Sequence, residues 1–289
     1  MSRLEVRKTY KLYVDGDFPR SESGRSYPAL DHRGEIIARV AAGTRKDLRH
    51  AVRCARKAQP GWAARTGYNR GQILYRIAEM VEDRAPTFAG RLRATGASTG
   101  KVRREVDQAV DRLVWYAGWA DKYQQVVGNV NPVSGPFFNI STAEPTGVVG
   151  VIVPDEPALL GLVSRVAPVI VSGNTAVVLA SERWPVPAIT FAEAMATADV
   201  PGGVVNVLTG QRSGMISHLA SHLDVNAIDA CGADPEMMVG LEEAAAGGVK
   251  RVVRPPEDRM DRADNRAAQS PYLISAFTEI KTVWHPKGL

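Results

Sequence analysis

The residues Val148-Val149-Gly150-Val151-Ile152-Val153 form an apolar run that stops at Pro154, and a helical pattern follows over residues 159–171 until Gly173. The same alternation continues with apolar runs over residues 176–179, 204–208, 225–230 and 249–253, separated by helical stretches over residues 188–198, 213–222 and 236–246. Short apolar runs that alternate with helices of about ten residues are typical of βαβ units, whose parallel strands are buried on both faces. Right-handed crossovers make this a doubly wound, Rossmann-like α/β domain.

The part of the chain before this region has a different pattern. Asp15-Gly16 and Ser23-Gly24 are turn pairs between short apolar stretches, so residues 10–31 are predicted to form a small hairpin region. Helical periodicity then predicts N-terminal helices over residues 46–59, 69–84 and 102–125. The last of these carries an aromatic cluster for which packing in the core is the expected role: Trp115, Tyr116 and Trp119.

The composition is typical of a soluble globular protein and argues against several functional classes. The 289 residues are 45% hydrophobic and 23% charged, with a net charge of +5. Basic residues are scattered among acidic ones, without an aromatic-interleaved basic stripe or zinc-finger spacing, so we expect no nucleic-acid partner. No apolar run approaches the roughly 20 residues that span a bilayer. Residues 1–10 lack the apolar core of an export signal, so we expect a cytoplasmic protein with no membrane partner.

Few residues stand in a pattern that indicates chemistry. No Gly-x-Gly-x-x-Gly fingerprint follows any of the five apolar runs, and Cys231-Gly232-Ala233 after the fourth run is only a fragment of one. A tight turn between a strand and a helix is the expected role of Gly232. His218 and His222 have the four-residue spacing of metal ligands on a helix, but no suitable third ligand is near, so we expect no metal site.

Two further candidates for chemistry follow apolar runs. Asp155 and Glu156 come after the first run, where catalytic groups often lie, but acids there also suit the N-terminus of the next helix, whose dipole favours them. Cys231 follows the fourth run, and because no histidine or acid is arranged beside it in sequence, we expect a small buried thiol. It lies far from Cys54, and both cysteines are expected to be free thiols.

Longer motifs recur in a fixed order along the chain. Residues 144–154 read EPTGVVGVIVP, residues 172–178 read SGNTAVV and residues 200–210 read VPGGVVNVLTG. These stretches resemble the cofactor domain of aldehyde dehydrogenases, and several upstream motifs look like the N-terminal half of the same family: residues 13–16, 61–62, 99–101 and 116–122. The resemblance extends from Lys11 to about Arg254 and implies the fold of that family's NAD-binding domain.

The resemblance also implies that the aldehyde and cofactor sites are degenerate. The family has a Pro-Trp-Asn-like turn whose Asn helps to bind the aldehyde oxyanion, whereas Pro154 is followed here by Asp155 and Glu156, whose charge repels an oxyanion. Of the family's residues around the ribose and the pyrophosphate, this chain keeps Glu182 and Gly232. The others are replaced by Leu179, Ala233, Asp234 and Met237. We therefore expect no catalytic residue and no bound cofactor, with weak NAD binding through Glu182 and Gly232 as the alternative.

The family's catalytic domain has no counterpart after Arg254. A polar linker is predicted over residues 255–270 instead, and neither Cys54 nor Cys231 matches the family's nucleophile. Residues 276–284 resemble the family's C-terminal strand, which belongs to its oligomerisation arm. The predicted organisation is a cofactor-domain-like region over residues 1–123 and 144–254, the linker over residues 255–270, and a small β oligomerisation arm over residues 124–143 and 271–289.

This combination is similar to the truncated, cysteine-less C-terminal module of two-module aldehyde dehydrogenases, here as a free-standing chain. It predicts a non-catalytic subunit that associates with and scaffolds a full-length aldehyde dehydrogenase, or that forms a homo-oligomer through the same arm. Two alternatives remain. One is a residual NAD(P)- or nucleotide-binding protein that uses Glu182 and Gly232, and the other is an aldehyde oxidoreductase with an unorthodox site at Cys231 or Glu156.

Overall fold

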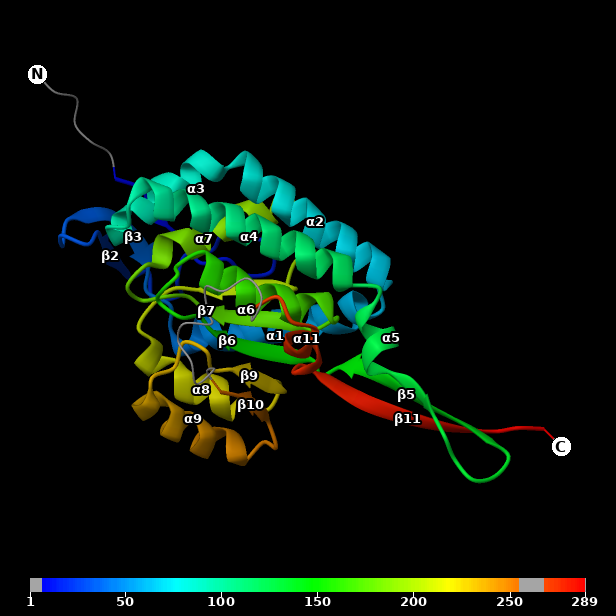
Figure 1. Ribbon diagram of the computed structural model, residues 1–289. Helices are drawn as coiled ribbons and strands as arrows, with labels where there is room; N and C mark the ends of the chain where they lie inside the picture. The colour runs from blue at the N-terminus through cyan, green and yellow to red at the C-terminus, as the bar shows by residue number, and fades with distance from the viewer. Residues whose placement is uncertain (1–6, 255–267, 289) are drawn as a thin grey trace, which may run out of the picture.

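A computed structural model describes residues 7–254 and 268–288 and contains a central parallel sheet between two layers of helices (Figure 1). The sheet has the strand order β10-β9-β6-β7-β8, and every neighbouring pair is parallel. Its strands are β6 (Val148–Ile152), β7 (Thr175–Leu179), β8 (Val205–Leu208), β9 (Ala227–Asp229) and β10 (Arg251–Val253). The predicted doubly wound α/β fold is confirmed, although β9 and β10 are shorter than the apolar runs that predicted them.

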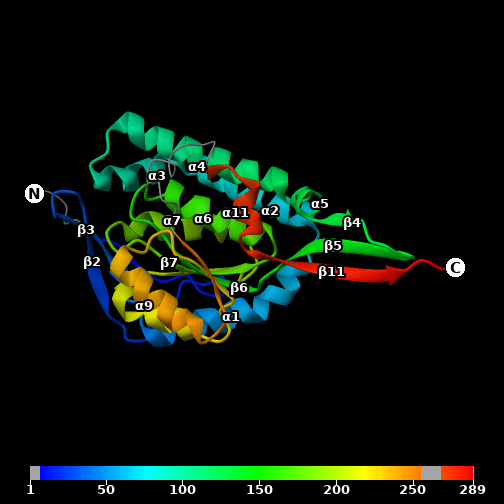
Figure 2. The ribbon, with the colours of Figure 1, turned by 60° about the horizontal axis from the view of Figure 1, so that its bottom comes forward.

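Helices cover both faces of this sheet (Figures 1 and 2). One face carries α6 (Leu160–Val171) and α7 (Pro185–Met195), with α2 (Gly67–Asp83), α3 (Ala85–Leu92) and α4 (Thr99–Trp119) outside them. The other face carries α1 (Arg45–Ala63), α8 (Ile216–Ser221) and α9 (Pro235–Ala246). Side chains along β6 point alternately to the two faces of the sheet. Val149 and Val151 pack in the core on the side of α6 and α7, whereas Val148 and Ile152 pack in the core on the side of α1, α8 and α9. Gly150 leaves room for helix α8, since a Cβ atom there would lie 2.8 Å from the Leu219 side chain.

The N-terminal hairpin differs from the prediction. The strands β1 (Thr9–Tyr10), β2 (Ser26–Leu30) and β3 (Ile36–Ala41) form a sheet of order β1-β3-β2. The hairpin therefore joins β2 to β3, beyond the predicted limit at residue 31. Strand β3 was missed because Ile36 and Ile37 are adjacent in the sequence, so apolar and polar residues do not alternate there; the structure leaves both side chains exposed. Asp15 and Gly16 do form a tight turn, with φ values of 57° and 86°, as the sequence predicts.

The predicted helix over residues 102–125 is in fact two helices. Helix α4 ends at Trp119, and the short α5 (Tyr123–Val127) follows after a turn in which the Lys122 amide donates to the Trp119 carbonyl, 3.1 Å away. This turn lets the buried Tyr123 hydroxyl donate to the Ser172 carbonyl at 3.2 Å, just after the end of α6, and no periodicity signals such a contact. Helix α3 and the 3₁₀ turn η1 (Arg93–Thr95) were not predicted. No helix among the described residues combines the length and apolarity needed to cross a bilayer.

A third sheet projects from the body of the molecule (Figures 1 and 2). Its order is β11-β5-β4, and it consists of β4 (Asn129–Asn131), β5 (Phe137–Pro145) and β11 (Thr278–Pro286), all antiparallel. We refer to these three strands as the arm. The short helix α11 (Pro271–Ser275) precedes β11 and contacts α5 and α6. Most of the predicted linker, residues 255–267, lies outside the described residues, but Ala268 is buried and its carbonyl accepts a hydrogen bond from Tyr116 at 3.1 Å.

Candidate functional site

The strand order of the central sheet defines where a ligand would be expected. Strand β6 lies in the middle, β7 and β8 follow on one side of it, and β9 and β10 lie on the other. The connections therefore run in opposite directions from β6, which places a topological switch point between β6 and β9. Doubly wound sheets bind ligands in the crevice outside the carboxyl ends of their strands at such a point. We therefore take this crevice as the candidate site.

Gly232 lies directly at the switch point. Its amide donates to the Ile152 carbonyl at 2.8 Å, so the turn after β9 is bonded to the end of β6. A Cβ atom on Gly232 would lie 2.2 Å from the Val153 carbonyl oxygen. Glycine is required here because the two backbones approach each other too closely for any side chain.

The strand ends at the crevice are bridged by a residue that sequence reasoning missed, Arg212. Its side chain is buried, and its Nε donates to the Ala180 carbonyl at 3.1 Å, after β7. Its Nη2 donates to the Val153 carbonyl after β6, and its Nη1 donates to the Gly232 carbonyl at 3.4 Å. One guanidinium thus joins the ends of three strands. Nothing local marks it in the sequence, since it is a single arginine at the start of the 3₁₀ turn η2 (Arg212–Gly214) after β8.

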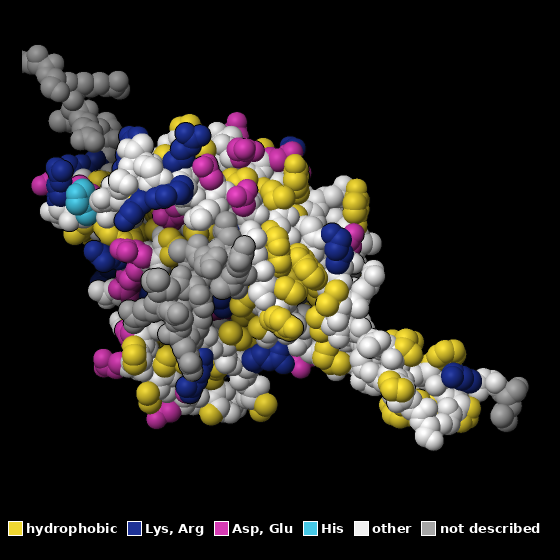
Figure 3. All heavy atoms as spheres, viewed as in Figure 1, with side chains coloured by type: hydrophobic (Ala, Val, Ile, Leu, Met, Phe, Trp, Pro, Cys, Tyr) yellow, Lys and Arg dark blue, Asp and Glu magenta, His cyan; other side chains and the backbone are white. Residues whose placement is uncertain are grey.

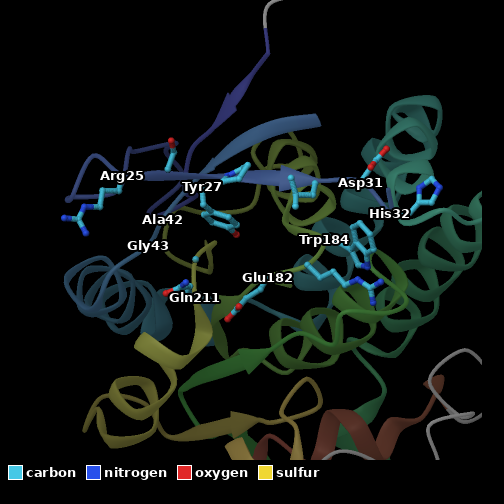
Figure 4. Close-up of a pocket in the computed structure, with 14 residues that line it drawn as sticks. Arg25, Tyr27, Asp31, His32, Ala42, Gly43, Glu182, Trp184 and Gln211 are labelled. Carbon is cyan, nitrogen blue, oxygen red and sulfur yellow. The ribbon is translucent and has the colours of Figure 1, made fainter. Parts of the chain in front are cut away.

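Glu182 lies on the other side of Arg212. Its carboxylate accepts a hydrogen bond from the Arg212 backbone amide, while the Arg212 side chain reaches Gly232. The structure therefore brings the two predicted cofactor residues together, but with Arg212 between them. Glu182 also lines a cavity of about 620 Å³ between the β2–β3 hairpin and the β7–α7 loop, into which Tyr27 points (Figure 4). Burial, and secondly the nearby Glu182 carboxylate, raises the pKa of the Tyr27 hydroxyl.

Asp155 and Glu156 do not lie in the first turn of the helix that follows them, contrary to the sequence interpretation. Helix α6 begins only at Leu160 and has no acid in its first turn. Asp155 instead accepts a hydrogen bond from the Ser181 hydroxyl at 2.6 Å and lies 3.5 Å from the Arg212 guanidinium. Glu156 lies on the surface, 3.6 Å from Arg183. Both acids therefore neutralise arginines.

The N-terminus of α6 is capped from another helix. The Glu105 carboxylate on α4 accepts hydrogen bonds from the Leu159 amide at 2.7 Å and the Leu160 amide at 3.3 Å. Burial raises the pKa of Glu105, and the two amide hydrogen bonds oppose this effect. Sequence reasoning missed Glu105 because it lies more than fifty residues before the helix that it caps.

The remaining candidates occupy structural positions. Cys231 and Cys54 are both buried, and burial raises the pKa of the Cys54 thiol. His218 lies within α8, but His222 follows the helix with an extended backbone, so the predicted helical spacing of the two is lost. Within residues 7–254 and 268–288, no group of three histidine, cysteine or acidic side chains is placed to hold a metal.

The residues around the crevice do not fit a dinucleotide. Arg212 fills the space between the strand ends, and the N-terminus of α9 is already capped by Asp234, which accepts from the Met237 amide at 2.8 Å. A phosphate there would meet a carboxylate in place of open amide groups. The open cleft of about 980 Å³ outside this turn has mixed charged groups along its walls, namely Lys101, Glu105, Asp155, Glu156, Arg183 and Asp234.

Comparisons with known proteins agree on the family. The model of the aldehyde dehydrogenase family matches residues 20–254. Cytosolic aldehyde dehydrogenase 1 of Elephantulus edwardii is 31% identical over 261 residues, which are 87% of this chain and 51% of the relative. The mitochondrial aldehyde dehydrogenase family 2 member B4 of Arabidopsis thaliana is 33% identical over 250 residues, or 84% of this chain and 45% of the relative.

Solved structures give the same result. The structure of PnpE in complex with nicotinamide adenine dinucleotide superimposes with a TM-score of 0.79 at 30% identity, over 84% of this chain and 50% of that one. HpcC from Thermus thermophilus superimposes with a TM-score of 0.81 at 28% identity, over 85% of this chain and 48% of that one. The chain thus spans about half the length of these relatives. The predicted family is confirmed, and the chain belongs to the aldehyde dehydrogenase family.

Proposed function

We propose that this chain is a non-catalytic subunit that associates through its arm with a full-length aldehyde dehydrogenase and scaffolds that enzyme. The observation that carries the proposal is a row of exposed apolar side chains across all three strands of the arm. Val283 pairs directly with Ile140, and Ile140 pairs directly with Val130, so the three side chains lie side by side on one face. They are 47%, 45% and 59% exposed, respectively.

Further apolar side chains surround this row on the arm. Figure 3 shows hydrophobic side chains gathered along the projection, and the exposed ones beyond the row are Phe137, Phe138, Ile280 and Trp284. Clusters of large apolar side chains on a protein surface mark sites of protein–protein contact. A surface of β-branched and aromatic residues is suited to a partner sheet, because such residues pack well against another pleated face.

The outer edge of the arm supports the same proposal. Among the described residues, the nine-residue strand β11 pairs only with β5, so its other edge presents free backbone groups. A long edge strand of this kind is a template for strand addition by another chain. An arm that combines an open edge with an apolar row is therefore suited to association rather than to a free existence in solvent.

The candidate site supports the non-catalytic half of the proposal. An oxyanion formed after β6 would meet the carboxylates of Asp155 and Glu156, which offer it no hydrogen-bond donor and are already paired with Arg212 and Arg183. The Cys231 side chain is only 3% exposed, so an aldehyde could not reach its sulfur without a rearrangement of the turn after β9. The family relatives supply the class of partner, since we expect an arm of this family to be complementary to arms of its own kind.

Affinity purification of the tagged chain from its own cells tests this proposal. The expected result is a full-length aldehyde dehydrogenase in a fixed ratio, and Ile140→Glu combined with Val283→Glu should abolish its recovery because charge is placed in the contact. Tyr75→Glu is the matched control, since Tyr75 is a comparably exposed apolar residue on α2, away from the arm. Recovery of the chain as a monomer, or an undiminished yield of the enzyme with the doubly substituted chain, would overturn the proposal.

A further inference from the structure

The strand ends at the switch point are bridged by a side chain of the chain itself. We propose that Arg212 permanently occupies the space between the ends of β6, β7 and β9 and takes a place in which a sheet of this strand order would hold part of a dinucleotide. Its side chain is only 5% exposed, although it comes from the short 3₁₀ turn η2 (Arg212–Gly214). The proposal concerns the isolated chain and is independent of any partner at the arm.

The guanidinium uses its N–H groups to bind backbone carbonyls at the strand ends. The Nε–H, one Nη1–H and one Nη2–H are directed at the carbonyl groups of Ala180, Gly232 and Val153, which end two strands and form the turn after a third. The carboxylate of Asp155 lies 3.5 Å from Nη2 and balances the positive charge. Burial lowers the pKa of Arg212, and Asp155 and then Glu182 oppose this effect, so the neighbouring acids are what make a buried cation tolerable.

Both ends of Arg212 are held. While the side chain reaches the strand ends, the backbone amide donates to the Glu182 carboxylate, and Asp155 is itself fixed by the Ser181 hydroxyl at 2.6 Å. Withdrawing the side chain would break all of its bonds and leave the buried Val153 and Ala180 carbonyl groups without this donor. Orphaned buried carbonyls are costly, so the arginine is not expected to swing out and admit another ligand.

The charge around the crevice argues against a role for Arg212 as a phosphate ligand. A phosphate that approached the guanidinium would also approach the Asp155 carboxylate, and one at the N-terminus of α9 would meet the capping carboxylate of Asp234. The inward-directed donors would have to leave their carbonyl partners first. Arg212 therefore stabilises the strand ends in the way that a bound ligand would, and the crevice needs no ligand to hold its shape.

Thermal unfolding of the purified chain tests the structural part of this proposal. Arg212→Ala is expected to lower the unfolding midpoint by about 5–10 °C, because several charged hydrogen bonds are lost together. Arg212→Lys keeps the charge but donates from one atom, so it should recover only part of the loss, and it remains informative if Arg212→Ala fails to fold. The control is Arg183→Ala, an exposed neighbour, which should shift the midpoint by less than about 2 °C. Equal midpoints for Arg212→Ala and the unmodified chain would overturn the proposal.

Ligand addition tests the occupancy itself. Millimolar ethylguanidinium matches the atoms removed in Arg212→Ala, and it should raise that variant's midpoint while ethylammonium does less and the unmodified chain does not respond. Calorimetric titration of the unmodified chain with NAD is expected to give no binding. If the unmodified chain binds NAD and Arg212→Ala or Arg212→Lys weakens this binding, Arg212 is a cofactor ligand. If ethylguanidinium does not raise the midpoint of Arg212→Ala, the substitution left no specific cavity. Either result overturns the proposal.

Discussion

Arg165 and Asp229 form a buried ion pair, with Nε 2.5 Å from Oδ2, that joins helix α6 to the carboxyl end of strand β9. The other oxygen of Asp229 accepts the Cys231 amide at 3.0 Å. One carboxylate therefore fixes both a covering helix and the start of the turn that leads to Gly232. The tight turn at the switch point depends on this pair as well as on the glycine.

Asp229→Asn is expected to lower the free energy of unfolding by about 3–5 kcal/mol, because it leaves Arg165 as a buried charge without its counter-charge. Urea unfolding measures the change. Arg254→Met provides the control, since it breaks the exposed Arg254–Glu242 pair at 2.7 Å and should cost less than about 1 kcal/mol. Comparable losses in the two variants would contradict a special role for the buried pair.

Gly232→Ala is expected to be destabilising by about 1–3 kcal/mol or more, because the added Cβ would lie 2.2 Å from the backbone oxygen of Val153 and the strand ends must move apart. Gly240→Ala is the matched change. Gly240 lies within α9 with no atom near its missing Cβ, so alanine should stabilise the chain by up to about 1 kcal/mol. Chemical unfolding of both variants distinguishes them, and a neutral Gly232→Ala would contradict the close approach.

Asn174 connects the arm to the parallel sheet. Its Oδ1 accepts the Gly147 amide at 2.7 Å, and its Nδ2 donates to the Phe277 carbonyl at 2.7 Å, immediately before β11. Asn174→Ala should cost about 3–5 kcal/mol, since it leaves several buried groups without partners. Hydrogen exchange should also increase along residues 278–286. The exposed Asn129→Ala serves as the control, and unchanged exchange in β11 with Asn174→Ala would count against this connection.

The capping carboxylate of Glu105 predicts a pH dependence. Burial raises the pKa of Glu105 above its usual value of 4.5, so its stabilising contribution is complete below pH 4.5 and is lost as the pH rises through the native pKa. Glu105→Gln keeps an acceptor for the amides of α6 and does not titrate. The stability of the unmodified chain relative to this variant should therefore fall from about pH 4.5 upward and then level off. Thermal midpoints of both proteins over this pH range give the difference in stability. If the unmodified chain instead became more stable relative to the variant as the pH rises, burial would not be the dominant effect on the pKa of Glu105.

Much of the fold could be read from local patterns. The five apolar runs became the five parallel strands because strands such as β6 and β7, which are buried on both faces, are apolar whichever neighbours they have. Gly232 was likewise placed in a tight turn by its position after a run. By contrast, the helical stretch over residues 102–125 and the acids after β6 were misread. The contact of Tyr123 with Ser172 after the helix break, and the cap that Glu105 supplies to α6, join residues from different helices, which local patterns do not report.

By itself the sequence determined the family and the alternation of strands and helices, because these depend on neighbouring residues or on motifs in order. Only the tertiary structure decided that Arg212 bridges the strand ends, that it stands between Glu182 and Gly232, and that Val130, Ile140 and Val283 form one exposed row. The physical reason is that these relationships join residues tens to more than a hundred positions apart. Their energy comes from burial and charge at a point where strand ends or strand faces meet, and no local periodicity reports it.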